Sequence, residues 1–428
     1  MQFRIRLFLL ICLALSLSGL TLVAASSAFV EPDVTVIHAI NGEQVGDGYG
    51  WVAENLGDIS GDGVNDFITS APFYVENGLV IGRAYVYSGV DGALLNVVSG
   101  SGNDWLGYGA THAGDVNNDG VPDYIVGAPL GSYAQVYSGA DHSLLLTLPG
   151  NGSDRFGFSV STAGDVNNDG HDDLFIGAIF ANGFAGSVFL YSGADGLLIW
   201  TQNGLEAGDV LGTALGKVGD VNNDNVPDLV AGAASAGLSD GGEAYVYSGL
   251  DGSLIHTLQP FSPGTAQNFG LFFANGAGDI NSDNTPDIFV ADYNDKRGGG
   301  FGTGRAYLYS GVDGSTLYRF DADNKRDGFG PGRGTGDVNG DGYGDVIIAA
   351  YTASDGAPAA GKATLYSGAD GSVLRAMTGS VAHDNVGVDA LSVGDVNGDG
   401  LADYLLTAVG LNFLGLDVGH LYIVAGNP

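Results

Sequence analysis

Residues 114–129 read GDVNNDGVPDYIVGAP, and variants of this stretch recur along the whole chain. The shared pattern is Gly-Asp-x-(Asn or Ser)-x-Asp-x-x-x-Asp. Its first Asp falls at seven positions, namely Asp58, Asp115, Asp165, Asp220, Asp279, Asp337 and Asp395. Successive copies are 57, 50, 55, 59, 58 and 58 residues apart. A regular period of this length indicates a repeat architecture, so the 428 residues should not be divided into domains by length alone.

Each repeat contains four short segments with the composition of β-strands. A pair such as Phe156-Gly157 comes before the acidic stretch, and an apolar run such as 125–128 follows it. An alternating segment with a turn comes next, as in 84–92, and then a fourth apolar run, as in 94–98. This order predicts a four-stranded antiparallel sheet per repeat. We expect an all-β fold, a seven-bladed β-propeller of four-stranded antiparallel blades, because the repeats of the alternative, a β-solenoid, are much shorter.

The two ends of the chain predict how the ring closes. The last repeat stops after its third segment, at 421–424, and a matching fourth segment stands at 34–40, ahead of the first repeat. We expect this N-terminal strand to complete the last blade and to remove an open sheet edge. The prediction is a single propeller over 29–428, with blades near 44–101, 102–152, 153–205, 206–262, 263–324, 325–380, and 381–428 plus 34–40.

The first 28 residues have the order of an export signal. Arg4 and Arg6 precede a nearly wholly apolar stretch, 7–23, and small residues follow at 24–28. We predict a signal peptide over 1–28 and a secreted or cell-surface protein, with a retained membrane anchor as the alternative. The only cysteine, Cys12, lies inside this segment, so the mature chain would have no disulfide.

The composition limits the possible functions. The formal net charge is -35, which disfavours binding to nucleic acid and to anionic lipid and attracts divalent cations. Apolar residues make up 45% of the chain, too many for a disordered acidic tail.

The acidic stretches predict calcium sites. Oxygens at loop positions 1, 3, 5 and 9 can converge on one ion together with the carbonyl of position 7, and calcium takes six to eight hard oxygens in a flexible arrangement. Three Asp within nine residues, seven times over, would repel one another without a cation. Position 12 of the loop is not the Glu that an EF-hand requires, so these loops are not EF-hands. The alternative to calcium sites is a set of Asx turns without metal. We predict up to seven structural Ca²⁺ ions, with these ligands: Asp58, Ser60, Asp62, Asp66, Asp115, Asn117, Asp119, Asp123, Asp165, Asn167, Asp169, Asp173, Asp220, Asn222, Asp224, Asp228, Asp279, Asn281, Asp283, Asp287, Asp337, Asn339, Asp341, Asp345, Asp395, Asn397, Asp399 and Asp403.

These motifs together make the chain resemble the FG-GAP repeats of the integrin α-subunit head. The resemblance implies a seven-bladed propeller with calcium in the hairpin loops between the first two strands of a blade, and a role in adhesion and ligand recognition. The chain departs from integrins because it has no leg domains or C-terminal membrane helix in the sequence and carries an acidic loop in every repeat. A free-standing secreted relative is therefore the better analogy.

Two classes of function follow. The first is an extracellular adhesion or binding module for a protein or glycan, with no catalytic residues. Its expected surface is the irregular stretches 73–82, 233–242, 292–304 and 353–361, with Phe73, Tyr74, Tyr293 and Phe301 as possible contacts. The second is a polysaccharide lyase or hydrolase with a site on the propeller axis, which would need basic or His groups to converge there. The string 237–241 matches G-x-S-x-G, but it lacks the strand before and helix after that a hydrolase requires.

Overall fold

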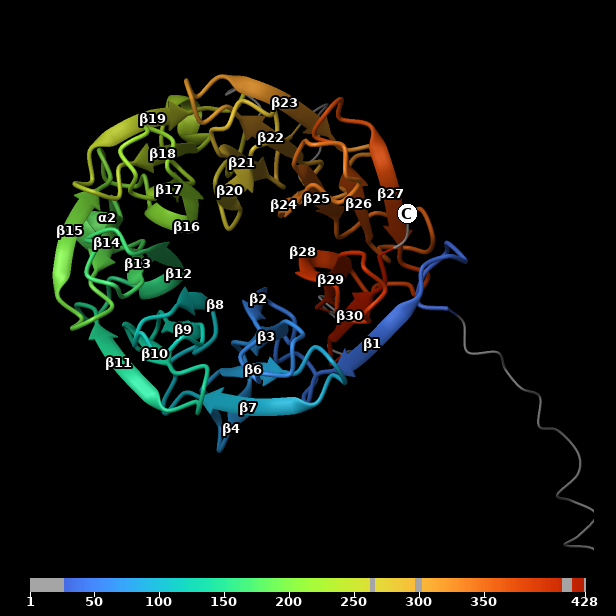
Figure 1. The fold of residues 1–428 in the computed structure, drawn as a ribbon, viewed down its shortest axis with the longest axis horizontal. Coiled ribbons are helices and arrows are strands. Elements are labelled where there is room, and N and C mark those ends of the chain that lie inside the picture. The colour runs from blue at the N-terminus through green and yellow to red at the C-terminus, as the bar shows by residue number, and fades with distance from the viewer. Residues whose placement is uncertain (1–26, 262–265, 297–301, 410–417, 427–428) are drawn as a thin grey trace, which may run out of the picture.

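The fold is a closed ring of seven four-stranded antiparallel sheets around one axis (Figure 1). This computed structural model describes residues 27–261, 266–296, 302–409 and 418–426. The prediction of an all-β, seven-bladed propeller is confirmed. In every blade the first strand lies nearest the axis and the fourth lies at the outside of the ring.

The blades follow one another in chain order. Blade 1 contains β2 (Ala53–Gly57), β3 (Asp66–Ala71), β6 (Arg83–Tyr87) and β7 (Leu94–Ser99). Blade 2 contains β8 (Gly109–Gly114), β9 (Asp123–Ala128), β10 (Tyr133–Tyr137) and β11 (Leu144–Pro149). Blade 3 contains β12 (Phe156–Gly164), β13 (Asp173–Ala178), β14 (Ser187–Tyr191) and β15 (Leu198–Asn203). Blade 4 contains β16 (Leu211–Gly219), β17 (Asp228–Ala233), β18 (Glu243–Tyr247) and β19 (Leu254–Leu258).

The remaining blades repeat this pattern. Blade 5 contains β20 (Ala274–Gly278), β21 (Asp287–Asp292), β22 (Arg305–Tyr309) and β23 (Thr316–Asp321). Blade 6 contains β24 (Phe329–Gly336), β25 (Asp345–Ala350), β26 (Lys362–Tyr366) and β27 (Val373–Thr378). Blade 7 contains β28 (Val386–Gly394), β29 (Asp403–Ala408), β30 (His420–Val424) and β1 (Val36–Asn41). Short elements lie between strands: the β4 (Val75–Glu76) and β5 (Leu79–Val80) hairpin, α2 (Ala181–Phe184) and the 3₁₀ turn η1 (Leu238–Asp240).

Burial explains why the four segments of a repeat differ in composition. All six residues of each second strand are buried, which accounts for continuous apolar runs such as that of β9. The fourth strands have one face toward solvent and mix exposed with half-buried residues. Clusters of buried apolar side chains lie at all seven interfaces between neighbouring blades. Most of the hydrophobic stabilisation therefore comes from stacking one blade on the next.

The N-terminal strand closes the ring, as predicted. β1 pairs antiparallel with β30, with Val36 opposite Val424 and Ile40 opposite Leu421. The segment before β1 also reaches blade 6, where the Glu31 carboxylate accepts hydrogen bonds from the backbone N and Oγ1 of Thr378. The chain ends thereby tie blade 7 to blade 6 and to each other.

The predicted signal segment lies outside the described residues except for its last two positions, Ser27 and Ala28. Within the described part of the chain, no helix has the length and apolar character needed to cross a bilayer.

Candidate functional site

The seven acidic stretches form seven loops in equivalent places. Each loop connects the first strand of its blade to the second, so all seven lie on one face of the ring. Each brings its own four predicted ligand positions near one another.

The loop conformation is set by carboxylates that accept backbone N–H groups. In the second loop the Oδ1 of Asp115 accepts from the backbone N of Asp119, at 3.0 Å, and its Oδ2 accepts from that of Gly120, at 2.9 Å. The Oδ1 of Asp119 in turn accepts from the backbone N of Val121 at 2.9 Å. The same three bonds recur in all seven loops. Carboxylates at positions 1 and 5 are therefore built into the turn itself.

The Asp at position 9 has a separate structural role. In the second loop this residue is Asp123, whose Oδ2 accepts from the backbone N of Val116 and whose Oδ1 accepts from that of Gly139. Gly139 stands in the turn between strands three and four, and the equivalent bond occurs in every blade. Burial raises the pKa of Asp123 to about 6, its backbone hydrogen bonds oppose this shift, and the nearby charge of Asp119 adds to it. A cation beside these carboxylates would favour their charged form.

The donor set suits calcium, but the described conformation does not by itself form a metal cage. Among the described residues, no group of three or more His, Cys, Asp or Glu side chains is gathered closely enough to hold a metal ion. The observed hydrogen bonds are those of Asx turns. The calcium ligands therefore remain a prediction, and binding would require the exposed or half-buried side chains at positions 1, 3 and 5 to turn toward a common centre.

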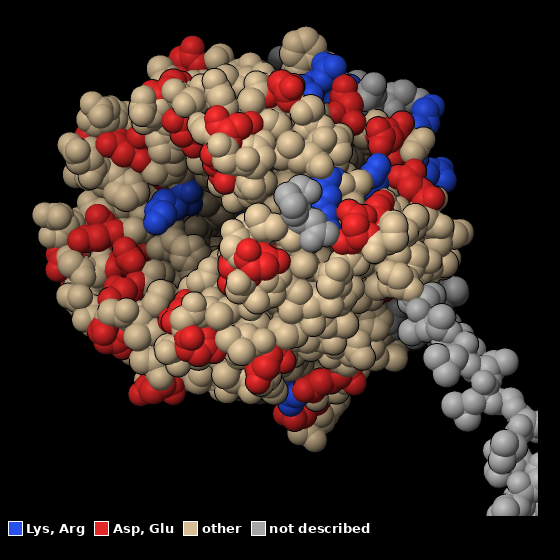
Figure 2. Space-filling model, turned by 45° about the vertical axis from the view of Figure 1, so that its right-hand side comes forward, with Lys and Arg blue, Asp and Glu red and all other residues tan. Residues whose placement is uncertain are grey.

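A cavity of about 350 Å³ lies on the propeller axis and is lined mainly by the first strands of the blades. Figure 2 shows a hollow at the centre of the ring with a basic side chain at its edge. Its volume lies at the lower end of the range for small-molecule sites. Polar and aromatic side chains occupy different levels of this cavity.

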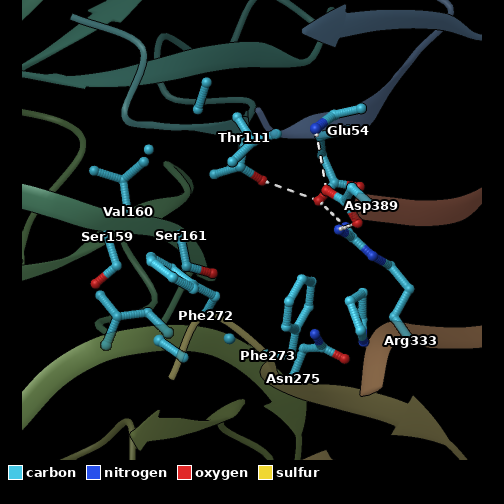
Figure 3. Close-up of a pocket in the computed structure, with 18 of the residues that line it drawn as sticks. Glu54, Thr111, Ser159, Val160, Ser161, Phe272, Phe273, Asn275, Arg333 and Asp389 are labelled. Carbon is cyan, nitrogen blue, oxygen red and sulfur yellow. Dashed lines mark hydrogen bonds and ion pairs between the residues drawn. The ribbon is translucent and has the colours of Figure 1, made fainter. Parts of the chain in front are cut away.

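Five polar residues from five blades form the polar girdle of the cavity: Glu54, Thr111, Asn275, Arg333 and Asp389 (Figure 3). The Arg333 guanidinium lies between two carboxylates, with Nη1 2.5 Å from Glu54 Oε2 and Nη2 2.8 Å from Asp389 Oδ1. Burial disfavours its charge, but Asp389 and Glu54 more than offset this and raise the pKa of Arg333. Blades 1, 6 and 7 are thus joined by one ion-pair network.

Two atoms of the polar girdle are buried without a partner. Within the described residues neither Asn275 Oδ1 nor Arg333 Nε has a hydrogen-bond partner. Burying a polar atom without a partner costs free energy, so both atoms would gain from a partner supplied at the cavity that their residues line. His112 and Lys217 line the same cavity, and burial, the largest influence, lowers the pKa of His112. Three basic residues, His112, Lys217 and Arg333, therefore lie together at the axial cavity.

Four aromatic rings form the aromatic platform of the cavity: Trp51, Tyr108, Phe158 and Phe272. Phe272 belongs to blade 5, yet its ring centroid lies 5.9 Å from Trp51 in blade 1, 6.3 Å from Tyr108 in blade 2 and 5.9 Å from Phe158 in blade 3. The ring therefore reaches across the axis. Trp51 precedes Glu54 by three residues, which places the platform about 10 Å along the strand from the girdle.

The backbone of Phe272 is strained, with φ of 68°. Blade 5 has one residue more than blades 1 to 4 between the Gly before the first strand and the first Asp of its loop. The extra residue and the left-handed conformation together direct a bulky side chain over the axis. Such strain in a non-glycine residue often accompanies a functional role.

The described parts of the irregular stretches proposed as a binding surface lie at the same end of the ring as the aromatic platform, because the second strand returns from the acidic loop to that end. Phe73 contacts Trp51, with ring centroids 5.5 Å apart, and Tyr293 contacts Phe272 at 6.4 Å. Tyr74 is instead buried beneath the Arg83 guanidinium, and Phe301 lies outside the described residues. The G-x-S-x-G string forms a loop containing η1 and is not followed by a longer helix.

The sequence reasoning missed the polar girdle, although a signal was present. Glu54, Thr111, Asn275 and Arg333 each stand four residues before the first Asp of their loop. An alignment of the repeats on that Asp would have shown that this position is polar in five of the seven copies, with Gly216 and Leu391 in the other two.

Comparisons with known proteins agree with this architecture. The FG-GAP repeat model matches residues 156–191 and 329–366, within blades 3 and 6. The chain therefore contains FG-GAP repeats, which confirms the resemblance inferred from its motifs.

The chain is also similar to integrin α subunits over part of its length. It is 34% identical to human integrin alpha-6 over 97 residues, or 22% of this chain and 8% of that protein. It is 33% identical to mouse integrin alpha-7 over 96 residues, or 21% and 8% respectively, and 30% identical to chicken integrin alpha-8 over 109 residues, or 23% and 10%. The matches thus span a tenth or less of these integrin subunits.

Proposed function

We propose that this protein is an exported, calcium-stabilised FG-GAP propeller that acts as an extracellular adhesion or ligand-binding module for a protein or glycan, with its ligand site at the axial cavity. The observation that carries this proposal is the pairing of an aromatic platform with a polar girdle whose buried Asn275 Oδ1 and Arg333 Nε lack partners. Integrin α subunits, similar over part of the chain, support an extracellular role.

The proposed role of calcium is structural. Each loop holds at least three Asp within nine residues. Burial is the main cause that raises the pKa of the carboxyl at position 9, and the carboxylate at position 5 adds to this shift. A bound cation would relieve this repulsion and stabilise the hairpin that joins the first two strands of a blade. The loops lie at the opposite end of the first strands from the aromatic platform, so the ions would support the blades without touching the ligand.

Binding to immobilised ligands tests this function. The labelled mature chain is applied to an array of glycans and extracellular-matrix proteins in 1 mM calcium and in EDTA. Phe272→Ala removes the platform ring that crosses the axis. Phe184→Ala is the matched control, because Phe184 also has a positive φ, of 71°. Unlike Phe272, Phe184 is exposed, and Phe180 is the one aromatic ring that it contacts among the described residues.

We expect calcium-dependent retention that Phe272→Ala reduces and Phe184→Ala does not. Retention that is equal in wild type and Phe272→Ala would show that the axial cavity is not the ligand site. The absence of any retained ligand would contradict the binding function.

A second candidate, an enzyme acting on polysaccharide, gains support from one observation. Glu54, Asp389, His112 and Arg333 share the axial cavity, so it holds carboxylates and basic groups near one another. Incubation with neutral and acidic polysaccharides, followed by assays for new reducing ends and for unsaturated products, distinguishes the enzyme from the binding module. Product formation that Glu54→Gln abolishes would favour the enzyme.

A further inference from the structure

We infer that the axial cavity binds a neutral saccharide, and that a terminal sugar ring lies against the aromatic platform with its hydroxyl groups directed at the polar girdle. This inference rests on the proposed ligand-binding function and names the chemical class that the cavity selects.

The polar girdle favours hydroxyl groups over a single charged group. Asn275 Oδ1 is an acceptor without a partner and Arg333 Nε is a donor without a partner among the described residues. The Glu54 and Asp389 carboxylates already accept from Arg333, and the Thr111 hydroxyl already donates to Glu54 Oε2 at 3.4 Å and can still accept. A hydroxyl group is both donor and acceptor, so neighbouring hydroxyls can satisfy such a mixed set. An anion would find acceptors facing it, and a cation would find donors.

The charges of the cavity are nearly balanced. Arg333 already pairs with Glu54 and Asp389, at 2.5 and 2.8 Å, and Lys217 supplies a second positive charge nearby. Two carboxylates therefore face two cationic groups, and the cavity requires no charge from its ligand. A charged ligand would lose its hydration on entering the cavity and would find no excess of opposite charge to compensate for that loss.

The aromatic platform suits the apolar face of a sugar ring. Phe158 and Phe272 are nearly parallel, at 13°, whereas Tyr108 is tilted by 45° from Phe158 and Trp51 stands edge-on to Phe272, at 84°. The π face of an aromatic ring is negative and attracts the weakly positive C–H groups of a pyranose. The separation of about 10 Å along the strand lets one ring contact the platform while its hydroxyls reach the girdle. The volume of about 350 Å³ admits one or two sugar units.

The alternative is a cationic side chain held by the same aromatic rings. Such a ligand could donate to Asn275 Oδ1, but it has no acceptor for Arg333 Nε and would meet the positive charge of that guanidinium. The unpartnered donor of Arg333 therefore favours the saccharide.

Calorimetric titration and saturation-transfer NMR of the mature chain in 1 mM calcium test this inference. The probes are the methyl glycosides of glucose, galactose, mannose and N-acetylglucosamine, together with glucuronate, glucosamine and arginine amide. Wild type is compared with Phe272→Ala, Asn275→Ala and the Phe184→Ala control. Melting temperatures establish that each variant is folded.

We expect at least one neutral glycoside to bind more tightly than every charged probe. Phe272→Ala is expected to weaken that binding about tenfold and Asn275→Ala about fivefold, while Phe184→Ala leaves it unchanged. Binding of arginine amide or glucuronate without any neutral glycoside would overturn the saccharide class. Neutral glycosides that bind Phe272→Ala and Asn275→Ala as tightly as wild type would overturn the site.

The outcomes of this experiment distinguish an error in the saccharide inference from an error in the proposed function. If no neutral glycoside binds but array retention still falls in Phe272→Ala, the saccharide inference is wrong and the binding module stands. If array retention is absent altogether, the binding function itself is wrong.

Discussion

Arg333→Met is the substitution whose effect on stability the structure defines most directly. The guanidinium joins β24 in blade 6 to Glu54 in blade 1 and Asp389 in blade 7, and Met keeps most of the aliphatic volume while removing the charge. The Glu54 and Asp389 carboxylates would then lie near each other without the guanidinium between them.

The size of the effect follows from burial. Removing one partner of a fully buried ion pair costs about 3–5 kcal/mol. The Arg333 and Glu54 side chains are each 19% exposed and that of Asp389 is 5% exposed, and Asp389 keeps backbone hydrogen bonds from Ala53 and Ala390. We therefore expect a loss of about 2–4 kcal/mol in the free energy of unfolding, at the lower end of the buried range.

Urea denaturation at pH 7 measures this loss. Arg319→Met is the control, because Arg319 pairs with Asp321 at 3.0 Å on the outer strand β23 and its side chain is 37% exposed, so its loss should be below about 1 kcal/mol. Adding Glu54→Gln to Arg333→Met removes one of the two facing charges and should recover at least half of the loss. If Arg333→Met costs no more than Arg319→Met, or if Glu54→Gln makes the variant still less stable, the ion-pair network does not hold the ring as described.

Three further predictions concern calcium, pH and ring closure. Chelation should lower the melting temperature, because a site with a dissociation constant of about 0.1 mM contributes roughly 1.4 kcal/mol at about 1 mM calcium. Asp119→Ala and Asp169→Ala should each remove part of this effect, whereas equal midpoints in EDTA and calcium, with no calcium found by elemental analysis, would leave the loops as plain turns. Burial raises the pKa of Asp292 to about 7, so this carboxyl lowers stability progressively as the pH rises from about 4 to about 7. The free energy of unfolding of Asp292→Asn, minus that of wild type, should therefore rise by on the order of 3 kcal/mol between pH 5 and pH 8. A difference that stays constant over this range would contradict the raised pKa of Asp292. Deleting the chain through Asn41 should expose the edge of β30, so we expect a lower melting temperature and concentration-dependent association in light scattering; a monomer with an unchanged melting temperature would refute the role of β1.

The acidic loops were predicted from the sequence, and their calcium ligands stay a prediction. The motif placed all seven loops correctly between the first and second strands, since Gly, Asn and Asp favour turns wherever they occur. Hydrogen bonds within each loop, such as those of Asp115 and Asp119, account for the same residues without a metal. Only a measurement of bound calcium separates the two explanations.

The sequence alone determined the number of blades, their four strands and the closing strand. These features depend on local alternation, turn residues and a count of segments, and β1 was predictable because the seventh repeat lacked its fourth segment. The axial site was decided only by the tertiary structure. Arg333 and Glu54 are 279 positions apart, and no local pattern relates them. Closing seven blades into a ring brings one position of every first strand to the same axis, so side chains that are distant and unlike in sequence become neighbours. The extra residue in blade 5 then directs Phe272 across that axis, where it contacts rings from three other blades.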